Sequence, residues 1–290
     1  MQPNKEDISN KISFLNHQFL KHENCLLPIE DRSVQFADSA YEVILYFNDN
    51  LVDFSDHFDR FQHSLDGLEI NYKIDSDLFL SYSRKLFLLN NLEQGTIYWQ
   101  ITRGTHKRIA NVPNDILPTI IATVNDIKRV TKEEFERGFK VIIEPDLRWQ
   151  KCNLKTTSLI ASSLTNQKAK NLGYDDAIMF RDNKITEATF ANVFVVKNGK
   201  LFTPKANNSI LNGITRRRIM AIANERQIET LETDIMINQL LEADEIFLTS
   251  SSLIIRPILE VFYENKTINL LKNNVLTKLM RECYKEFSGF

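Results

Sequence analysis

Lys155 is the residue whose surroundings best suit covalent chemistry. It follows Asn153 and Leu154 and precedes two threonines, just before a helix that we expect to begin near Thr157. A helix N-terminus and partial burial both lower the pKa of a lysine, and a lowered pKa makes the amine nucleophilic near neutral pH. Most lysines of a globular chain are solvated surface charges, so the pattern alone leaves a catalytic and a structural interpretation open.

A second feature is a group of cations and hydroxyls around the start of another expected helix. Residues 216–218 are arginines in the first turn of a helix expected at 214–224, where the helix dipole disfavours cations by about 0.3 to 1 kcal/mol each. The N–H groups of Gly213–Thr215 and the threonine hydroxyl could offset this by binding a phosphate, although ion pairs with surface carboxylates are the simpler explanation. The segment Thr249–Ser252 would either add donors or form an ordinary turn.

Composition narrows the class of protein. Three cysteines lie far apart, and the five histidines include no i, i+4 pair, so we expect neither a disulfide framework nor a metal site. The 36 basic and 38 acidic side chains give a net charge of -2, which offers no electrostatic reason for a nucleic-acid or membrane partner. No apolar run approaches the roughly 20 residues that span a bilayer. We therefore expect a cytoplasmic protein that acts on small molecules.

The elements that would position these residues alternate irregularly. In the first half we expect a hairpin over 41–52, a helix capped by Ser55, a second helix over 78–89, strands at 97–103, 119–124 and 139–143, and a long loop at 104–114. In the second half we expect helices at 157–172, 214–224 and 270–287 and strands at 176–180, 192–196, 200–203 and 245–249.

This order predicts an α+β fold rather than a doubly wound parallel sheet. The two expected domains span residues 1–144 and 145–290, with Lys155 near their junction. Since neither GxGxxG nor GxxxxGK[ST] occurs in the chain, a Rossmann or P-loop nucleotide site is not expected.

Several of these residues belong to short segments with a recognisable order. The segments are Glu30-Asp31-Arg32, Tyr41-Glu42, His57-Phe58-Asp59-Arg60, Thr102-Arg103-Gly104-Thr105 with Arg108, Asp146-Leu147-Arg148-Trp149, Asn153-Leu154-Lys155, Thr186-Glu187 with Asn192-Val193-Phe194, and Leu211 with Gly213-Ile214-Thr215-Arg216. Their order and spacing resemble those of the class IV, fold type IV, aminotransferases. Within that family, the loop from Arg103 to Asn111 most resembles the D-amino acid (D-alanine) aminotransferases.

The resemblance implies pyridoxal 5'-phosphate (PLP) as cofactor. Lys155 falls at the position of the lysine that bonds covalently to PLP and moves the proton between substrate and cofactor. Glu187 falls where the family's carboxylate meets the pyridine nitrogen and keeps it protonated. The other implied cofactor contacts, at the phosphate or the pyridine face, are Arg60, Leu211, Gly213, Ile214, Thr215, Ser250 and Ser251. With PLP as the anion, the arginine-rich helix start is interpreted as a phosphate site.

The resemblance also implies a trap for the substrate carboxylate. Tyr41 and Arg108 match two of its parts, and a guanidinium can bind a carboxylate bidentately. The third part is a histidine in the family, but Ala110 stands there. His57 and Arg148 match positions expected to support the geometry of Lys155 and Glu187. Phe190 and the replacements of family glycines by Ser33, Ala37, Ser39 and Ala188 bear on substrate size.

The function implied is transfer of the amino group of a D-amino acid to a 2-oxo acid such as 2-oxoglutarate or pyruvate. The alternatives are a branched-chain L-amino acid transaminase, an aminodeoxychorismate lyase, and a homologue without catalysis. Together Lys155, Glu187 and Arg60 argue against the last, since a binding protein would not need all three. The resemblance further implies a homodimer whose 103–112 loop reaches toward the neighbour's cofactor.

Overall fold

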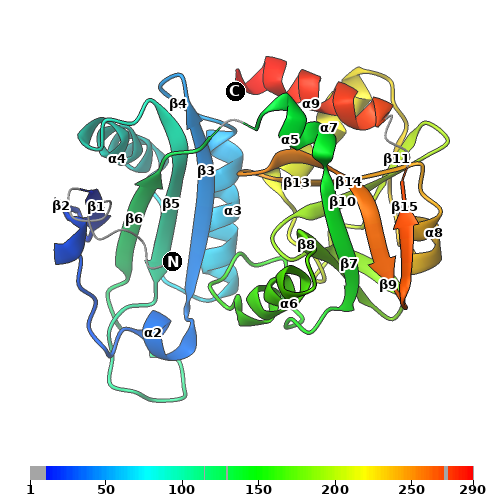
Figure 1. Cartoon of the computed structure of the whole chain (residues 1–290). Coiled ribbons are helices and arrows are strands. Elements are labelled where there is room, and N and C mark those ends of the chain that lie inside the picture. Colours follow the sequence, from blue (N-terminus) through cyan, green and yellow to red (C-terminus); the bar gives the residue numbers. More distant parts are fainter. Residues whose placement is uncertain (1–10, 114, 129, 271–273, 290) are drawn as a thin grey trace. The chain divides into compact units, whose positions relative to one another are not determined.

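The computed structural model describes residues 11–113, 115–128, 130–270 and 274–289. These residues form two compact units, both drawn in Figure 1. The first unit runs to Lys128 and also includes Leu154–Ser158, and the second contains the rest of the chain. We expected the division after residue 144, but it lies after Lys128. The reason is that strand β7 (Phe139–Pro145) is hydrogen-bonded within the sheet of the second unit.

The first unit is built on a six-stranded sheet in the order β2-β1-β6-β5-β3-β4. The strands are β1 (Ile12–Leu15), β2 (Gln18–Lys21), β3 (Ser39–Phe47), β4 (Asn50–Leu51), β5 (Gln94–Thr102) and β6 (Thr119–Asn125), and all their pairings are antiparallel. Asn48 and Asp49 adopt positive φ between β3 and β4, as a two-residue hairpin turn requires. The predicted hairpin is therefore confirmed.

Alternation along these strands separates a core face from an opposite face. Ile44 on β3 and Trp99 on β5 are fully buried with apolar residues of α3 (Phe54–Gly67) and α4 (Ser76–Leu89). Since neighbouring side chains point to opposite faces, Glu42 shares the core face while Tyr41 lies on the other. Both predicted helices are present, but Asp53 rather than Ser55 is the N-cap of α3, and its side chain makes no capping hydrogen bond.

Short helices and one long loop complete the first unit. The helices are η1 (His22–Asn24) and α2 (Arg32–Phe36). The expected loop is confirmed, because β5 ends at Thr102 and β6 begins only at Thr119. Within the loop, Thr105 makes a bridge to Asp31, which precedes α2. This bridge ties the start of the loop to the segment that leads into β3.

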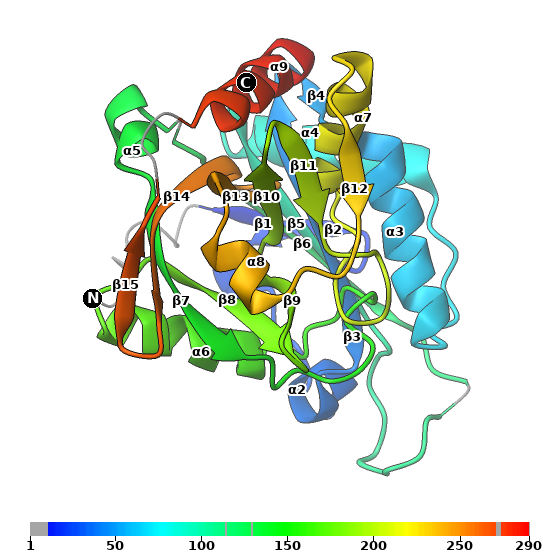
Figure 2. The same cartoon turned by 90° about the vertical axis from the view of Figure 1, so that its right-hand side faces the viewer.

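The second unit contains a nine-stranded mixed sheet. Its order is β12-β11-β10-β13-β14-β7-β8-β9, with β15 also paired to β14. Besides β7, the strands are β8 (Asp176–Arg181), β9 (Lys184–Ala188), β10 (Asn192–Lys197), β11 (Lys200–Thr203), β12 (Thr230–Glu232), β13 (Glu245–Ser250), β14 (Ile254–Tyr263) and β15 (Lys266–Asn269). Their mixture of parallel and antiparallel pairs confirms the α+β class and can be followed in Figure 2.

The helices of the second unit are α5 (Lys132–Arg137), α6 (Ile160–Asn171), α7 (Ile214–Glu225), α8 (Ile237–Leu241) and α9 (Val275–Ser288). The prediction for α7 is confirmed. The predicted start of α6 at Thr157 is wrong, because Thr157 donates its N–H to the Ser39 carbonyl and Thr156 bridges Ala40 on β3. For α9 the predicted start at residue 270 is wrong, and residues 271–273 lie outside the described residues. No described helix is both long and apolar enough to cross a membrane.

Candidate active site

Lys155 is held by backbone hydrogen bonds on both of its sides. Its carbonyl accepts the Tyr41 N–H at 2.9 Å, and its own N–H donates to the Ser64 hydroxyl of α3 at 3.0 Å. Its amine lies 4.4 Å from the centroid of the Tyr41 ring. Because α6 begins only at Ile160, Lys155 does not lie at a helix N-terminus, and that part of the expectation is wrong. The lysine is instead placed by β3 and α3.

A close contact beside Lys155 fixes the same segment. Leu154 is buried against the last residue of α3, Gly67, where an added Cβ would lie 2.5 Å from a Leu154 methyl carbon. A side chain at position 67 would therefore force the Leu154 side chain to shift. On the other side, Tyr41 stacks on Tyr98 with the ring centroids 5.4 Å apart, and burial raises the pKa of Tyr98. The lysine amine therefore contacts the outer ring of a fixed aromatic pair.

Arg60 lies on α3 and forms a buried cluster with Glu42 and His57. Its guanidinium donates twice to the Glu42 carboxylate, at 2.7 and 2.8 Å, and His57 Nδ1 lies 2.7 Å from the same carboxylate. Burial alone would raise the pKa of Glu42, but Arg60 and His57 outweigh burial and hold that pKa well below its usual range. Burial lowers the pKa of His57. The direct partner of His57 is thus Glu42, which also binds Arg60, and a supporting role of His57 toward Lys155 or Glu187 stays a prediction.

Glu42→Gln is expected to lower the free energy of unfolding by about 3 to 5 kcal/mol at neutral pH, because it removes the anion that compensates buried Arg60. The pKa of Glu42 is lower in the folded than in the unfolded protein, so the stabilisation is complete above the ordinary carboxyl pKa. It is lost as the pH falls toward the folded pKa. Urea unfolding of both proteins at pH 7 and at about pH 3 measures the difference; a difference that does not shrink in acid contradicts the assignment.

Arg108 lies exposed on the long loop of the first unit. Its guanidinium carbon is 5.2 Å from the ring centroid of Phe36, and Arg32 lies over the same ring at 4.3 Å. Arg32 also donates to the Ile109 carbonyl at 3.0 Å, which ties the loop to α2. The two residues expected to hold the substrate carboxylate therefore have different partners, since Tyr41 stacks on Tyr98.

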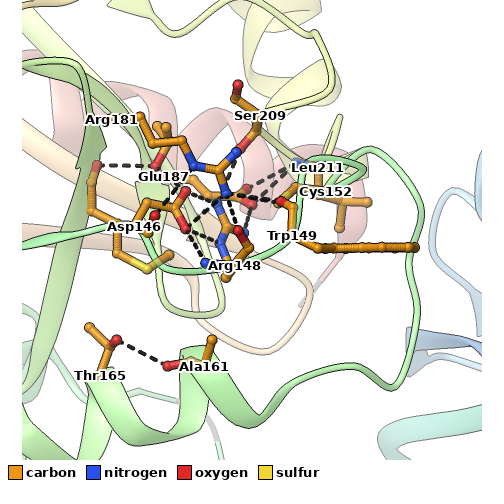
Figure 3. Close-up of polar contacts among 12 residues, drawn as sticks. Asp146, Arg148, Trp149, Cys152, Ala161, Thr165, Arg181, Glu187, Ser209 and Leu211 are labelled. Carbon is orange, nitrogen blue, oxygen red and sulfur yellow. Dashed lines mark hydrogen bonds and ion pairs between the residues drawn. The ribbon is translucent and has the colours of Figure 1, made fainter. Parts of the chain in front are cut away.

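Glu187 ends a buried network in the second unit, drawn in Figure 3. It accepts hydrogen bonds from Arg148 Nη1, from Asn192 Nδ2 at 2.9 Å, and from the Leu211 N–H at 3.2 Å. Burial raises the pKa of Glu187, and the charge and hydrogen bonds of its partners offset that effect only in part. A carboxylate in this state gains from a further cation beside it, such as a protonated ring nitrogen.

Arg148 is itself fixed by a second carboxylate. Asp146 accepts from Arg148 Nε at 2.9 Å and from Nη2 at 2.8 Å, and its other partners are Thr186 Oγ1 at 2.9 Å and Arg181 at 3.2 Å. Although burial opposes the effect, Asp146 and Glu187 together raise the pKa of Arg148. The outcome is a four-charge cluster of Asp146, Arg148, Arg181 and Glu187, in which Arg148 contacts both carboxylates (Figure 3).

The start of α7 presents backbone N–H groups without a side-chain cap. Gly213 is the N-cap residue, and an added Cβ there would lie only 2.0 Å from Asn192 Oδ1. Ile214 and Thr215 follow, both buried. Thr249 faces Asn192 across β10 and β13, and its buried hydroxyl has no hydrogen-bond partner among the described residues. An uncapped helix start and an unused buried hydroxyl are suited to an anion.

The arginines of α7 are directed elsewhere. Arg216 is fully buried and donates to Glu232 at 2.6 Å and to the Pro204 carbonyl at 2.8 Å. Arg218 lies 3.8 Å from the ring centroid of Phe287. The interpretation of these arginines as a sign of bound phosphate is therefore wrong for both, and the ion-pair explanation holds for Arg216. Farther along the chain, the Ser250 hydroxyl accepts the Leu253 N–H at 3.1 Å, as in an ordinary turn.

Three residues of this site were not predicted as functional: Asn192, Asp146 and Arg181. Asp146 and Asn192 stood within the family-like segments, but no role followed from their spacing. Asn192 carried one usable signal, since asparagine is unfavourable in a strand and here it opens the apolar strand β10. Arg181 gave no signal, because its partners are set by the pairing of β7 with β8.

Comparison with known proteins identifies relatives across most of the chain. The family model "Amino-transferase class IV" matches residues 39–261. A D-alanine aminotransferase of Staphylococcus epidermidis is 35% identical over 255 residues, covering 87% of this chain and 89% of the relative. A D-alanine aminotransferase of Listeria monocytogenes is 32% identical over 250 residues, covering 85% and 86%.

Solved structures show the same fold at lower identity. The branched-chain amino acid aminotransferase of Escherichia coli is 21% identical with a TM-score of 0.86, covering 96% of this chain and 94% of that one. A putative 4-amino-4-deoxychorismate lyase of Legionella pneumophila is 23% identical with a TM-score of 0.80, covering 90% and 95%. With these matches the fold is fold type IV, and the chain belongs to the class IV aminotransferases, which are PLP-dependent transaminases.

Proposed function

We propose that this enzyme transfers the amino group of a D-amino acid of the D-alanine type to a 2-oxo acid such as 2-oxoglutarate. The observation that carries the proposal is the set of relatives named D-alanine aminotransferase, 30 to 35% identical over 85 to 94% of this chain. Retention of Tyr41 and Arg108 supports the same substrate class. By the same resemblance, the enzyme acts as a homodimer, and its three widely spaced cysteines favour the reducing cytoplasm.

Two described residues, Lys155 and Glu187, have the chemistry that the pyridine ring and aldehyde of a PLP cofactor require. PLP, when bound, accepts electrons from the substrate Cα so that the Cα proton can leave. Lys155 supplies a half-buried amine, held in place by its backbone, that can bond to the cofactor and then carry this proton. Glu187 supplies a buried carboxylate whose raised pKa favours a neighbouring cation at the pyridine nitrogen.

The described residues also fit the phosphate. The N–H groups at the start of α7 have no side-chain cap, and the Thr249 hydroxyl is buried and unused within the described part of the chain. Both supply donors to an anion. We propose that Arg60, Ile214, Thr215 and Ser251 bind the phosphate as the family resemblance implies, and that Thr249 adds a hydroxyl.

Arg108→Ala is expected to reduce kcat/KM for D-alanine by about 10 to 150 fold, because a hydrogen bond to a charged group contributes roughly 1.5 to 3 kcal/mol. The loss should lie toward the severe end, since Ala110 has replaced the histidine that would share the carboxylate. Half-reaction rates with D-alanine, D-glutamate and their L-enantiomers measure this effect in wild type and variant.

The control is Lys107→Ala, which removes the neighbouring exposed cation of the same loop. It should leave the D-alanine rate within about twofold of wild type, as surface charges usually do. A wild type that prefers L-amino acids would favour a branched-chain transaminase, and one that releases an aromatic amine without amino transfer would favour a lyase. Either outcome overturns the D-amino acid proposal and leaves PLP dependence intact.

A further inference from the structure

Asn192 makes contacts that no catalytic role yet explains. Its side-chain nitrogen donates to Glu187 Oε2 at 2.9 Å and to the Leu211 carbonyl at 2.7 Å. Both partners are pure acceptors, so they fix which end of the amide carries the N–H groups. Both N–H groups of the amide therefore have an acceptor: one is the Glu187 carboxylate, and the other is the Leu211 carbonyl in the segment that leads into α7.

The opposite end of the same amide fills the space beside Gly213. An added Cβ on Gly213 would meet Asn192 Oδ1 at 2.0 Å, whereas the nearest atom outside Asn192 is the Arg216 Cβ at 3.5 Å. The contact with Asn192 is far below any tolerated distance, and the contact with Arg216 is ordinary packing. Asn192 is thus the neighbour that makes glycine necessary at the N-cap of α7.

Leu211 closes the arrangement into a ring. Its N–H donates to the Glu187 carboxylate and its carbonyl accepts from Asn192. Asn192 is also fixed by its backbone, because it pairs with Thr249 on β13 and follows a tight connection in which the Ala188 N–H bonds the Ala191 carbonyl. A buried network in which each N–H of the Asn192 amide has its own acceptor favours one arrangement.

We propose that Asn192 is a positioning residue that couples Glu187 to the start of α7, so that the acid for the ring nitrogen and the donors for the phosphate keep one spacing. The inference rests on the proposed roles of Glu187 and α7 in binding PLP. A rigid spacing matters because one cofactor must meet both groups, and a misplacement of about 1 Å is costly at a reacting centre.

The test is a double-mutant cycle on the 290-residue chain, freed of cofactor and titrated with PLP. Asn192→Ala should weaken PLP binding by about 10 to 100 fold through loss of a hydrogen bond to a charged acceptor. Gly213→Ala should cause a comparable loss through the clash with Asn192 Oδ1. In the Asn192→Ala background, Gly213→Ala should add less than about threefold, since the clashing oxygen is gone. Losses that simply multiply would overturn the coupling.

Two partial ligands test the contacts with the ring and the contacts with the phosphate separately. Pyridoxal has the ring without the phosphate, and inorganic phosphate represents the other end. Asn192→Ala should weaken the binding of both; an effect on one ligand alone would mean that Asn192 serves only that end, contrary to the proposal. Asn192→Asp keeps the shape but places an acceptor against Glu187, so it should bind PLP more weakly than Asn192→Ala. Equal or tighter binding by Asn192→Asp would likewise count against the proposal.

Asn90→Ala is the matched control. The Asn90 side-chain nitrogen also donates twice, to the Ile12 and Leu86 carbonyls of the first unit. This variant should lose thermal stability while its PLP affinity stays within about twofold of wild type, which separates positioning from general destabilisation. If the wild type itself fails to bind PLP, the proposed function fails. If the wild type binds PLP and Asn192→Ala binds it equally well, only the proposed positioning role of Asn192 fails.

Discussion

Lys155→Ala is expected to reduce turnover by roughly 10⁴-fold or more, since the covalent link and the proton carrier disappear together. PLP should still bind through the residues proposed for its phosphate and ring nitrogen. Because the backbone of Lys155, not its side chain, makes the hydrogen bonds to Tyr41 and Ser64, the variant should fold normally. Single-turnover rates with D-alanine, together with thermal unfolding, measure both expectations.

Borohydride identifies the same residue without a mutation. Reduction of the yellow wild-type enzyme should abolish its visible absorbance and leave the cofactor attached to Lys155 on peptide mapping. Lys151→Ala changes an exposed lysine a short distance earlier in the chain and should be labelled at Lys155 like the wild type. Label on any other lysine would remove the central assignment.

Glu187→Gln is expected to slow deprotonation of the substrate by about 10² to 10³ fold, a magnitude typical of removing one preorganised electrostatic group. The change removes charge and keeps size. It also leaves a single amide oxygen for the donors of Arg148, Asn192 and Leu211, so the apo protein should lose about 1 to 3 kcal/mol of stability. The rate should therefore be measured at saturating PLP in a single turnover, where this loss does not enter.

The control for that experiment is Glu144→Gln, a partly exposed carboxylate of the same unit that pairs with Lys168 at 2.6 Å. It should leave the single-turnover rate unchanged, because a surface ion pair contributes little. An unchanged rate in Glu187→Gln as well would show that the charge of Glu187 is not needed for electron withdrawal.

Local patterns predicted the elements whose formation depends on neighbouring residues. The hairpin after Phe47 and the helices α3, α4 and α7 follow from turn chemistry and apolar spacing. The start of α6 could not be predicted in this way, since it is displaced by the hydrogen bonds that join Lys155 and Thr157 to β3, far away in the sequence. The order of the strands in either sheet is likewise a long-range property that spacing does not encode.

For the site, the resemblance supplied the residues and the structure supplied their partners. Arg216 illustrates the gap, because its position in a helix start suggested an anion whereas its guanidinium reaches Glu232 on a distant strand. His57 is a second example. Its partner Glu42 lies on the face of β3 that packs against α3, so the pair could be recognised only once the sheet was known. Asn192 acts through two residues on different elements, so its contacts could not be read from spacing.

The four-charge cluster restricts which amino-acid substitutions this protein can accept during evolution. Its two guanidiniums and two carboxylates sum to zero charge when all are ionised, and the Asp146 side chain has no exposed surface at all. Neutral replacement of Asp146 alone would leave two guanidiniums with a single carboxylate in a buried setting, at a cost of several kcal/mol. Related proteins can therefore differ in these four residues through paired substitutions. Where Asp146 is replaced in a relative, Arg148 or Arg181 should be replaced as well.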